Sequence, residues 1–349
     1  MTIVGYYVPQ TLLRHEGIRR RSRATAEAWR DLGVATREIS SPDGAEMGAN
    51  LTLLGRHLAS DSAAARQAAE LFRSGELQHV HARLLAPTLP WIKLARDYPV
   101  SLEIHTPIFR PESSRDLLAR IALGAPTAPA LVSKAQGAAF ITHELAQRRE
   151  YRRIEPKVVV GAGKKLSTPE PAPRNDRLKV GMAVGSVARW HGVETLASWA
   201  DQQEDLEFVV VCPRAIEATL RSQFASSRLT LLPTSDQETY RSALASLDVA
   251  VGSLNLEAHG YGESATLKVR DYLDVGTPTL LAYPDTNLIG LHDPAILLAE
   301  HSVDRRQLVE WIRSMQGARV QQASRDAVSM QRIERNRLET LGLLGKDVA

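Results

Sequence analysis

The feature that most constrains this chain is an alternation of short apolar runs with longer helical patterns, which occurs twice. The short runs have the length of β-strands, and the segments between them have helical periodicity. Strands that alternate with helices form parallel sheets through right-handed crossovers. The chain is therefore predicted to be α/β, with two doubly wound domains. The predicted strands are 3–8, 34–39, 78–81, 100–105, 138–142 and 158–160 in the first half, and 178–184, 207–212, 229–232, 248–254 and 279–283 in the second.

A proline-rich stretch separates the two alternating halves. Pro169, Pro171 and Pro173 lie within residues 167–177, a composition typical of an extended, semi-rigid connector. We therefore predict a first domain over 1–166, a linker over 167–177 and a second domain over 178–325. A long, charged helical pattern runs from 303 to 344, with a break expected near Gly317. Its last part, 326–349, is expected to pack on the first domain.

The composition is that of a globular protein without a membrane span. The chain has 349 residues, of which 44% are hydrophobic and 24% charged. No apolar stretch approaches the roughly 18–20 residues that span a bilayer, and Met1–Tyr7 does not resemble a signal peptide. Cys212 is the only cysteine, so an intrachain disulfide is excluded and a cytoplasmic location is expected. We expect Cys212 to pack at the end of a buried strand.

Basic residues form two clusters although the net charge is only +3. Two interpretations stay open: solvated helix faces, or a surface for an anionic membrane or a phosphorylated acceptor. The second would place the protein at the inner membrane face. We expect no nucleic-acid partner, because zinc spacing, a helix-turn-helix pattern and an aromatic–basic platform are all missing. The clusters comprise Arg14, Arg19, Arg20, Arg21 and Arg23, and then Arg148, Arg149, Arg152 and Arg153.

The most informative segment covers residues 252–278. A glycine-containing loop follows a predicted strand and opens a helix that ends at Gly276-Thr277-Pro278. The first backbone N–H groups of such a helix have no intrahelical partner and point toward an anion site. Glu263 lies just before the helix and Asp271 two turns into it. By itself, a loop-to-helix phosphate site of this kind has little specificity.

This segment resembles the family 4 retaining glycosyltransferases. Their pattern is a Glu, seven residues, an acid, and a helix that ends in Gly-x-Pro, which Glu263, Asp271 and Gly276-Thr277-Pro278 match. Further likeness covers 158–163, 180–193 and 232–249, and it is strongest over 178–283. The resemblance implies the GT-B architecture, in which two Rossmann-like domains face a cleft and a C-terminal helix crosses back to the first domain.

The resemblance also implies a site for a nucleotide-sugar donor, a UDP- or GDP-sugar, in the second domain. Glu263 would contact the donor sugar at the reacting centre, and Asp271 would accept hydrogen bonds from the ribose hydroxyls. The base would be read by backbone near Pro233. The backbone amides of Ala265, Thr266 and Leu267 would hold the diphosphate.

Lys268 has two open interpretations: a charge at the diphosphate, or a solvated helix residue. The loop over 185–192 departs from the family pattern, because Ser186 and His191 stand where the family has Arg and Lys. Arg189 can replace the missing cation, since a guanidinium binds phosphate bidentately. His191 can donate a hydrogen bond. Asp271, where the family more often has Glu, has a shorter reach.

In the first domain, His105 ends the predicted strand 100–105. The resemblance implies that His105 faces the donor sugar and shares the catalytic role with Glu263, with Glu103 as the neighbouring alternative. Gly17, in the segment 10–19 after the first strand, would allow close approach to the diphosphate. Arg19 and His143 are expected on the acceptor side.

The resemblance implies retaining glycosyl transfer without a metal or other cofactor, with the departing diphosphate taking the acceptor proton. Two other functions remain open: a non-catalytic GT-B subunit that binds nucleotide or sugar, and a nucleotide-sugar epimerase of the same architecture. An epimerase requires further acids around the sugar, and none can be picked out. A phosphorylase would need a pyridoxal-binding lysine, and none stands out. The acceptor has no motif.

Overall fold

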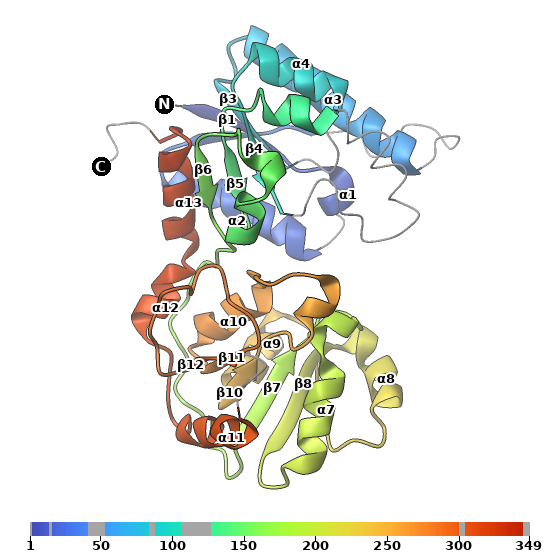
Figure 1. The fold of residues 1–349 in the computed structure, drawn as a ribbon, viewed down its shortest axis with the longest axis vertical. Helices are drawn as coiled ribbons and strands as arrows, with labels where there is room; N and C mark the ends of the chain where they lie inside the picture. Colours follow the sequence, from blue (N-terminus) through green and yellow to red (C-terminus); the bar gives the residue numbers. More distant parts are fainter. Residues whose placement is uncertain are drawn as a thin grey trace. The chain divides into compact units, whose positions relative to one another are not determined.

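The structure is a computed structural model, and it describes residues 2–13, 16–40, 53–83, 88–105, 127–299 and 304–344. The chain forms two compact units. Unit 1 comprises Met1–Gly161 with Met330–Ala349, and unit 2 comprises Ala162–Ser329 (Figure 1). Each unit contains a parallel sheet of six strands, which confirms the predicted α/β fold with two doubly wound sheets.

The sheet of unit 1 has the order β2-β1-β3-β4-β5-β6, and all its pairings are parallel. All six strands predicted for the first half are present. Because β1 lies between β2 and β3, the strand order reverses at β1, and parallel sheets bind ligands at such a switch point. The strands are β1 (Ile3–Tyr7), β2 (Ala35–Glu38), β3 (His79–Arg83), β4 (Val100–Ile104), β5 (Ala138–Phe140) and β6 (Lys157–Val159).

Helices cover both faces of this sheet. One face packs against α3 (Leu53–Arg73), which was not predicted, and α4 (Leu89–Asp97). The other face packs against α2 (Glu16–Asp31) and α13 (Met330–Thr340), which lie side by side (Figure 1). The C-terminal helix α13 therefore completes the core of unit 1. The short helices α1 (Gln10–Leu13) and α6 (His143–Ala146) and the helical residues 127–132 complete the described part of this unit.

The sheet of unit 2 has the order β12-β11-β10-β7-β8-β9. Its strands are β7 (Lys179–Ala183), β8 (Glu207–Pro213), β9 (Thr230–Thr234), β10 (Val249–Val251), β11 (Thr279–Leu281) and β12 (Ile296–Leu298). The edge strand β12 was not predicted; unlike the other three-residue strands, it contains no fully buried residue. Cys212 is buried on β8, as expected, and burial raises the pKa of its thiol to about 11.

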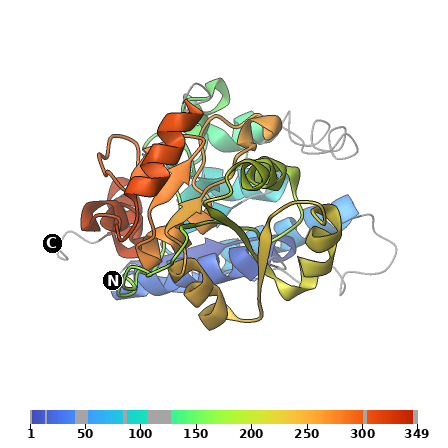
Figure 2. The same ribbon diagram turned by 90° about the horizontal axis from the view of Figure 1, so that it is seen from below.

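The helices of unit 2 also lie on both faces of their sheet. Helices α7 (Val193–Gln202) and α11 (Arg305–Ser314) lie on one face, where Arg305 donates to Gln202. Helices α9 (Gln237–Ala245) and α10 (Leu267–Val275) pack together on the other face (Figure 2). Helix α8 (Arg214–Gln223) lies between β8 and β9 in the chain.

The helical pattern expected over 303–344 with one break near Gly317 has two breaks, because the described residues form three helices: α11, α12 (Gln322–Ala327) and α13. The first break falls at the expected Gly317, whose φ of 73° is a left-handed conformation that favours glycine. The second break falls at Ser329, which forms a parallel bridge with Lys164. No helix in the described part of the chain is both long and apolar enough to cross a bilayer.

The proline-rich stretch over 167–177 lies within unit 2, and the chain divides after Gly161 instead of at the expected boundary, residue 166. The Ser167 N–H donates to Asp274 Oδ1 at 2.6 Å, and the Glu170 N–H donates to the Val275 carbonyl at 3.1 Å. This stretch is therefore bonded along the surface of unit 2. The chain passes between the units at Gly161–Ala162 and again at Ser329–Met330.

Docking of α13 is predicted to stabilise unit 1 through Leu338, whose side chain is completely buried. We expect Leu338→Ala to lower the free energy of unfolding of unit 1 by about 2–5 kcal/mol, because it leaves a cavity in the core. Hydrogen exchange of α2 and β6 in increasing urea measures this loss. The exposed neighbour Glu339 is the control, and Glu339→Ala should change stability by less than about 0.5 kcal/mol. Equal protection in Leu338→Ala and the wild type would contradict the docking.

Candidate functional site

In unit 2, two loops meet at the switch point of the sheet. Strand β7 pairs with β8 on one side and β10 on the other, so the loops after β7 and β10 leave the sheet side by side. The Leu254 N–H donates to the His191 carbonyl at 2.9 Å, which joins them. Gly192 has a φ of 73°, and a Cβ there would lie 2.7 Å from Leu254 Cβ. Only glycine allows this close approach of the two loops.

His191 and Lys268 are in direct contact at this point. His191 ends the short 3-10 helix η2 (Arg189–His191) after β7, and Lys268 lies in the first turn of α10. Lys268 Nζ donates to His191 Nδ1 at 2.8 Å and lies 5.5 Å from the centre of the Trp190 ring. Lys268 is only 9% exposed, so the interpretation of Lys268 as a solvated helix residue is wrong.

Burial changes the pKa values of both residues of this pair. It lowers the pKa of Lys268 to about 7, and together with the Lys268 charge it lowers the pKa of His191 to about 3. His191 is therefore neutral at pH 7. Because its Nδ1 accepts from Lys268, the proton of the ring sits on Nε2. This buried Nε2 has no hydrogen-bond partner among the described residues, so it is a donor available to a ligand.

The first turn of α10 is held firmly by its neighbours. The Thr266 and Tyr283 hydroxyls lie 2.9 Å apart. Arg270, which is completely buried, donates from Nε to the Ala162 carbonyl at 2.8 Å and forms a two-nitrogen ion pair with Asp285. Ala265 is buried and Leu267 exposed. The helix N-terminus, with its unpaired N–H groups, is thus fixed next to the Lys268 charge.

Glu263 is buried at the end of the loop that leads into α10. The next residue, Ser264, forms a parallel bridge with Asp285; its N–H donates to the Pro284 carbonyl at 3.2 Å, and its carbonyl accepts from the Thr286 N–H at 3.1 Å. Asp285 in turn pairs with Arg270. The backbone at Glu263 and the helix N-terminus are therefore positioned by the same buried ion pair.

Asp271 is half-buried and holds two polar partners. Lys164 Nζ lies 2.6 Å from Asp271 Oδ1, and the Tyr240 hydroxyl donates to Oδ2 at 3.1 Å. Each carboxylate oxygen can accept more than one hydrogen bond, so these contacts leave acceptor capacity.

The other residues proposed for the donor site are Ser186, Arg189 and Pro233. Ser186 and Arg189 are exposed in the loop after β7, where the Arg189 carbonyl accepts from Asn255 Nδ2 at 3.2 Å. Among the described residues, the Arg189 guanidinium forms no ion pair, and it is exposed, whereas Lys268 is buried. Pro233 is half-buried near the end of β9, opposite Cys212.

In unit 1, His105 follows the carboxyl end of β4 and is held by Glu103. His105 Nε2 lies 2.8 Å from Glu103 Oε1, and the Tyr6 hydroxyl donates to Oε2 at 3.1 Å. Burial and the nearby Arg83 charge lower the pKa of His105 to about 3. Glu103 is buried, yet Arg337, His105 and Arg21 hold its pKa well below the usual value. The two alternatives from the sequence, His105 and Glu103, are thus partners.

The remaining residues proposed in the first domain lie at helix starts. Gly17 is in the first turn of α2, which begins at Glu16, so the expectation that it belongs to a loop is wrong. Arg19 is exposed on the same helix. The clustered Arg21 turns inward, where it donates to the Gly161 carbonyl at 2.9 Å. His143 is exposed at the start of α6.

Four contributing residues escaped sequence reasoning: Lys164, Tyr240, Arg270 and Arg337. Lys164 and Tyr240 reach Asp271 from distant parts of the chain, 107 and 31 residues away. Arg270 and Arg337 lie in charged helical segments, where arginine is normally solvated. A sequence pattern shows periodicity but not which charged residue turns inward, so no signal was available for them.

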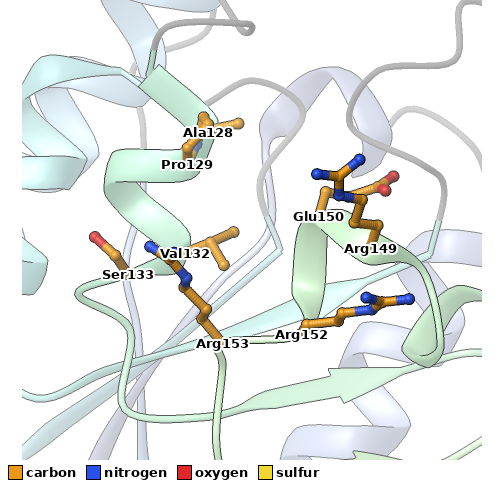
Figure 3. Close-up of a pocket in the computed structure, with 8 residues that line it drawn as sticks. All are labelled: Ala128, Pro129, Val132, Ser133, Arg149, Glu150, Arg152 and Arg153. Carbon is orange, nitrogen blue, oxygen red and sulfur yellow. The ribbon is translucent and has the colours of Figure 1, made fainter.

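A separate pocket of about 300 Å³ lies in unit 1 (Figure 3). Its lining combines an apolar wall from residues 128–132 with three exposed arginines, Arg149, Arg152 and Arg153. Its two segments precede β5 and β6 in the chain, so the pocket lies toward the amino ends of these strands. His105 lies at the carboxyl end of β4, so the pocket is distinct from the region of His105.

Comparison with known proteins gives matches of structure only. No protein-family model and no curated protein sequence matches the chain. A glycosyltransferase from Rickettsia africae is 13% identical with a TM-score of 0.67, and the match covers 99% of both chains. A sucrose-phosphate synthase from Thermosynechococcus elongatus is 14% identical with a TM-score of 0.61, covering 97% of this chain and 98% of that one.

The chain has the GT-B fold. A third solved structure with this architecture is the UDP-GlcNAc 2-epimerase from Neisseria meningitidis bound to UDP-GlcNAc. It is 10% identical with a TM-score of 0.50, covering 98% of this chain and 99% of that one. Because the similar structures include both transferases and an epimerase, the reaction must be argued from the site.

Proposed function

We propose that this protein is a retaining glycosyltransferase of the family 4 type, which transfers a sugar from a UDP- or GDP-sugar to an acceptor hydroxyl. The observation that carries the proposal is the buried Lys268–His191 pair next to the N-terminus of α10, directly after Glu263. A cation, an unpartnered N–H donor and a helix N-terminus together suit a diphosphate. The glycosyltransferase structures with this fold support the same class of reaction.

Each residue has a role in this proposal. Departure of the nucleoside diphosphate builds negative charge, which Lys268, His191 Nε2–H and the backbone amides of residues 265–267 stabilise. Glu263 binds the donor sugar, and Asp271 accepts from the ribose hydroxyls. His105 contributes from unit 1, again at the donor sugar. We also propose that the acceptor attacks on the leaving-group side, and that its proton passes to a diphosphate oxygen as the sugar–oxygen bond breaks.

Metal independence is part of the proposal, because Lys268 and the helix N-terminus can neutralise the diphosphate. We further propose a cytoplasmic location, because the chain has a single cysteine, Cys212, and so forms no internal disulfide. The alternatives are an epimerase, supported by the UDP-GlcNAc-bound structure of this fold, and a non-catalytic nucleotide-binding subunit.

The proposal is tested with a panel of UDP-, GDP- and dTDP-sugars. One donor should raise the melting temperature and be hydrolysed slowly in excess EDTA. Glu263→Ala should lower hydrolysis about 100-fold, the loss typical of one group at the reacting centre. Glu310→Ala, at an exposed acid on α11, is the control and should keep wild-type activity.

The outcomes separate the alternatives. Release of free nucleoside diphosphate and sugar supports the transferase, whereas a second nucleotide sugar as product identifies an epimerase. Stabilisation without turnover identifies a binding subunit. If no nucleotide sugar changes the melting temperature, the donor site is wrong, and activity that EDTA abolishes and magnesium restores would contradict the metal-free mechanism.

Donor affinity is predicted to fall as pH rises through about 7. The pKa of Lys268 is lowered to about 7 by burial, and only the protonated form attracts the diphosphate. Below this pH the lysine is already charged; above it, binding must take up a proton, so affinity falls by up to about tenfold per pH unit. Calorimetric titration of a nucleotide sugar at a series of pH values measures this.

Two variants of Lys268 test whether protonation of this lysine causes the pH dependence of donor affinity. Lys268→Arg stays charged at every pH of the titration, so it should remove the pH dependence. Lys268→Met should weaken binding at low pH and show no slope. An unchanged slope in Lys268→Met would assign the titration to another group.

The arginine pocket of unit 1 is proposed as a contact for an anionic membrane surface. Among the described residues, its one carboxylate, Glu150, pairs with Arg148 at 2.8 Å and so does not neutralise Arg149, Arg152 or Arg153. Arg153 extends toward residue 132, whereas Arg152 points the other way (Figure 3). Arginines that diverge beside an apolar wall suit a charged surface better than a single phosphate.

Replacing Arg149, Arg152 and Arg153 together by Gln is predicted to lower binding to phosphatidylglycerol vesicles about 100-fold, at about 1 kcal/mol per arginine. Vesicle sedimentation measures this. The matched control replaces Arg305, Arg306 and Arg313 of unit 2, which are also exposed. Equal losses in both triple variants would show only a general charge effect, and wild-type protein that does not bind these vesicles would overturn the contact.

A further inference from the structure

A buried network of charges in unit 1 joins the C-terminal helix α13 to His105. Arg337 on α13 is completely buried; its Nη1 lies 3.5 Å from Glu103 Oε1, and its Nε lies 3.1 Å from Glu334 Oε2. Arg21 on α2 places a second guanidinium 3.9 Å from Glu103 Oε1. The Trp29 indole N–H donates to Glu334 at 2.8 Å. Two guanidiniums therefore balance two carboxylates, and Arg337, Glu103 and Glu334 are buried.

This network determines which nitrogen of His105 carries the proton. Glu103 stays ionised because the arginines offset the cost of its burial. An ionised carboxylate only accepts hydrogen bonds, so His105 Nε2, 2.8 Å from Glu103 Oε1, must donate. The imidazole is neutral, since its pKa is lowered to about 3. The other nitrogen, Nδ1, is therefore an acceptor.

The same arginine orders a second chain of hydrogen bonds. Arg337 Nη1 lies 3.5 Å from His81 Nε2, and since a guanidinium only donates, this nitrogen accepts. His81 Nδ1 then donates to Ser101 Oγ at 2.7 Å, and the Ser101 hydroxyl donates to His79 Nε2 at 2.8 Å. The side chains of β3 and β4 that point to this face are thus oriented from one guanidinium on α13.

We propose that Arg337 is a positioning residue for His105: through Glu103 it holds His105 as the neutral Nε2–H tautomer, so that Nδ1 accepts a hydrogen bond from a hydroxyl of the donor sugar. The contact with the sugar rests on the proposed function, whereas the tautomer does not. The charged groups that face His105 are Glu103 from its own strand, Arg83 from β3 and Arg21 from α2.

Loss of the Arg337 charge has a definite chemical consequence. Without this cation the Glu103–His105 pair takes up a proton at a higher pH, and the proton has two places to go. On His105 it forms an imidazolium, in which Nδ1 is protonated. On Glu103 it makes the carboxyl a donor to Nε2, which moves the ring proton to Nδ1. In both cases Nδ1 changes from acceptor to donor.

The test is 15N NMR of the full chain with labelled histidine, without substrate, with the His105 signal assigned from His105→Gln. In the wild type, His105 should be the neutral Nε2–H tautomer over the range of about pH 6 to 9. In Arg337→Met it should carry a proton on Nδ1 at the lower end of this range. Arg337→Lys should restore the wild-type tautomer. Arg335→Met, which removes an exposed charge from the same helix, is the control.

Donor hydrolysis gives the second readout. Arg337→Met should have a lower kcat that rises with pH by up to about tenfold per pH unit, whereas Arg335→Met should follow the wild type. Where Arg337→Met does not fold, Arg337→Gln replaces it. The wild type alone also tests the proposal, because a ring proton on His105 Nδ1 would overturn it. An unchanged tautomer in folded Arg337→Met or Arg337→Gln also overturns it. If His105 has the Nε2–H tautomer but the protein hydrolyses no donor, the proposed function is refuted and the role of Arg337 in setting the tautomer stands.

Discussion

The buried ion pair between Arg270 and Asp285 is the interaction on which the candidate donor site depends. Arg270 also bonds to the Ala162 carbonyl, and Asp285 pairs with Ser264 in a parallel bridge. Removing one partner of such a pair leaves an uncompensated buried charge, which typically costs about 3–5 kcal/mol. The start of α10 and the backbone at Glu263 therefore have a fixed geometry before any ligand arrives. A site that binds a diphosphate needs this order, because preorganised donors stabilise developing charge without reorganisation.

Burial of charge has opposite results in the two units. Lys268 is buried with a neutral histidine as its partner, so desolvation dominates and its pKa falls to about 7. Glu103 is buried among two arginines, so its pKa falls well below the usual value and it stays charged. The first arrangement makes a cation whose charge can respond to an arriving anion. The second keeps a fixed charge that orients His105, so each pattern suits its proposed role.

Much of the fold followed from the sequence because strands and helices alternate with little ambiguity, and eleven of the twelve observed strands matched predicted runs. The failures have physical reasons. Strand β12 lies at the sheet edge and contains no fully buried residue, so it shows no buried apolar run. The helical segment over 303–344 has a second break at Ser329, which pairs with the distant Lys164. The pairing of His191 with Lys268 joins residues 77 positions apart, so no local pattern contains it. Residues such as Arg337 were missed because periodicity does not show which charge turns inward.

The contact between His191 and Lys268 changes the meaning of the departure from the family pattern. Viewed along the sequence, His191 stands where the family has Lys, and a cation is lost from the loop after β7. In space, Lys268 reaches the same loop from α10 and places its ammonium 2.8 Å from His191 Nδ1. The charge has thus moved from a loop to a helix whose first turn is held by Arg270. A lysine on such a rigid turn loses less conformational freedom when it binds an anion than one on a loop. Under the proposed function, Lys268 therefore takes the place of the loop cation at the diphosphate.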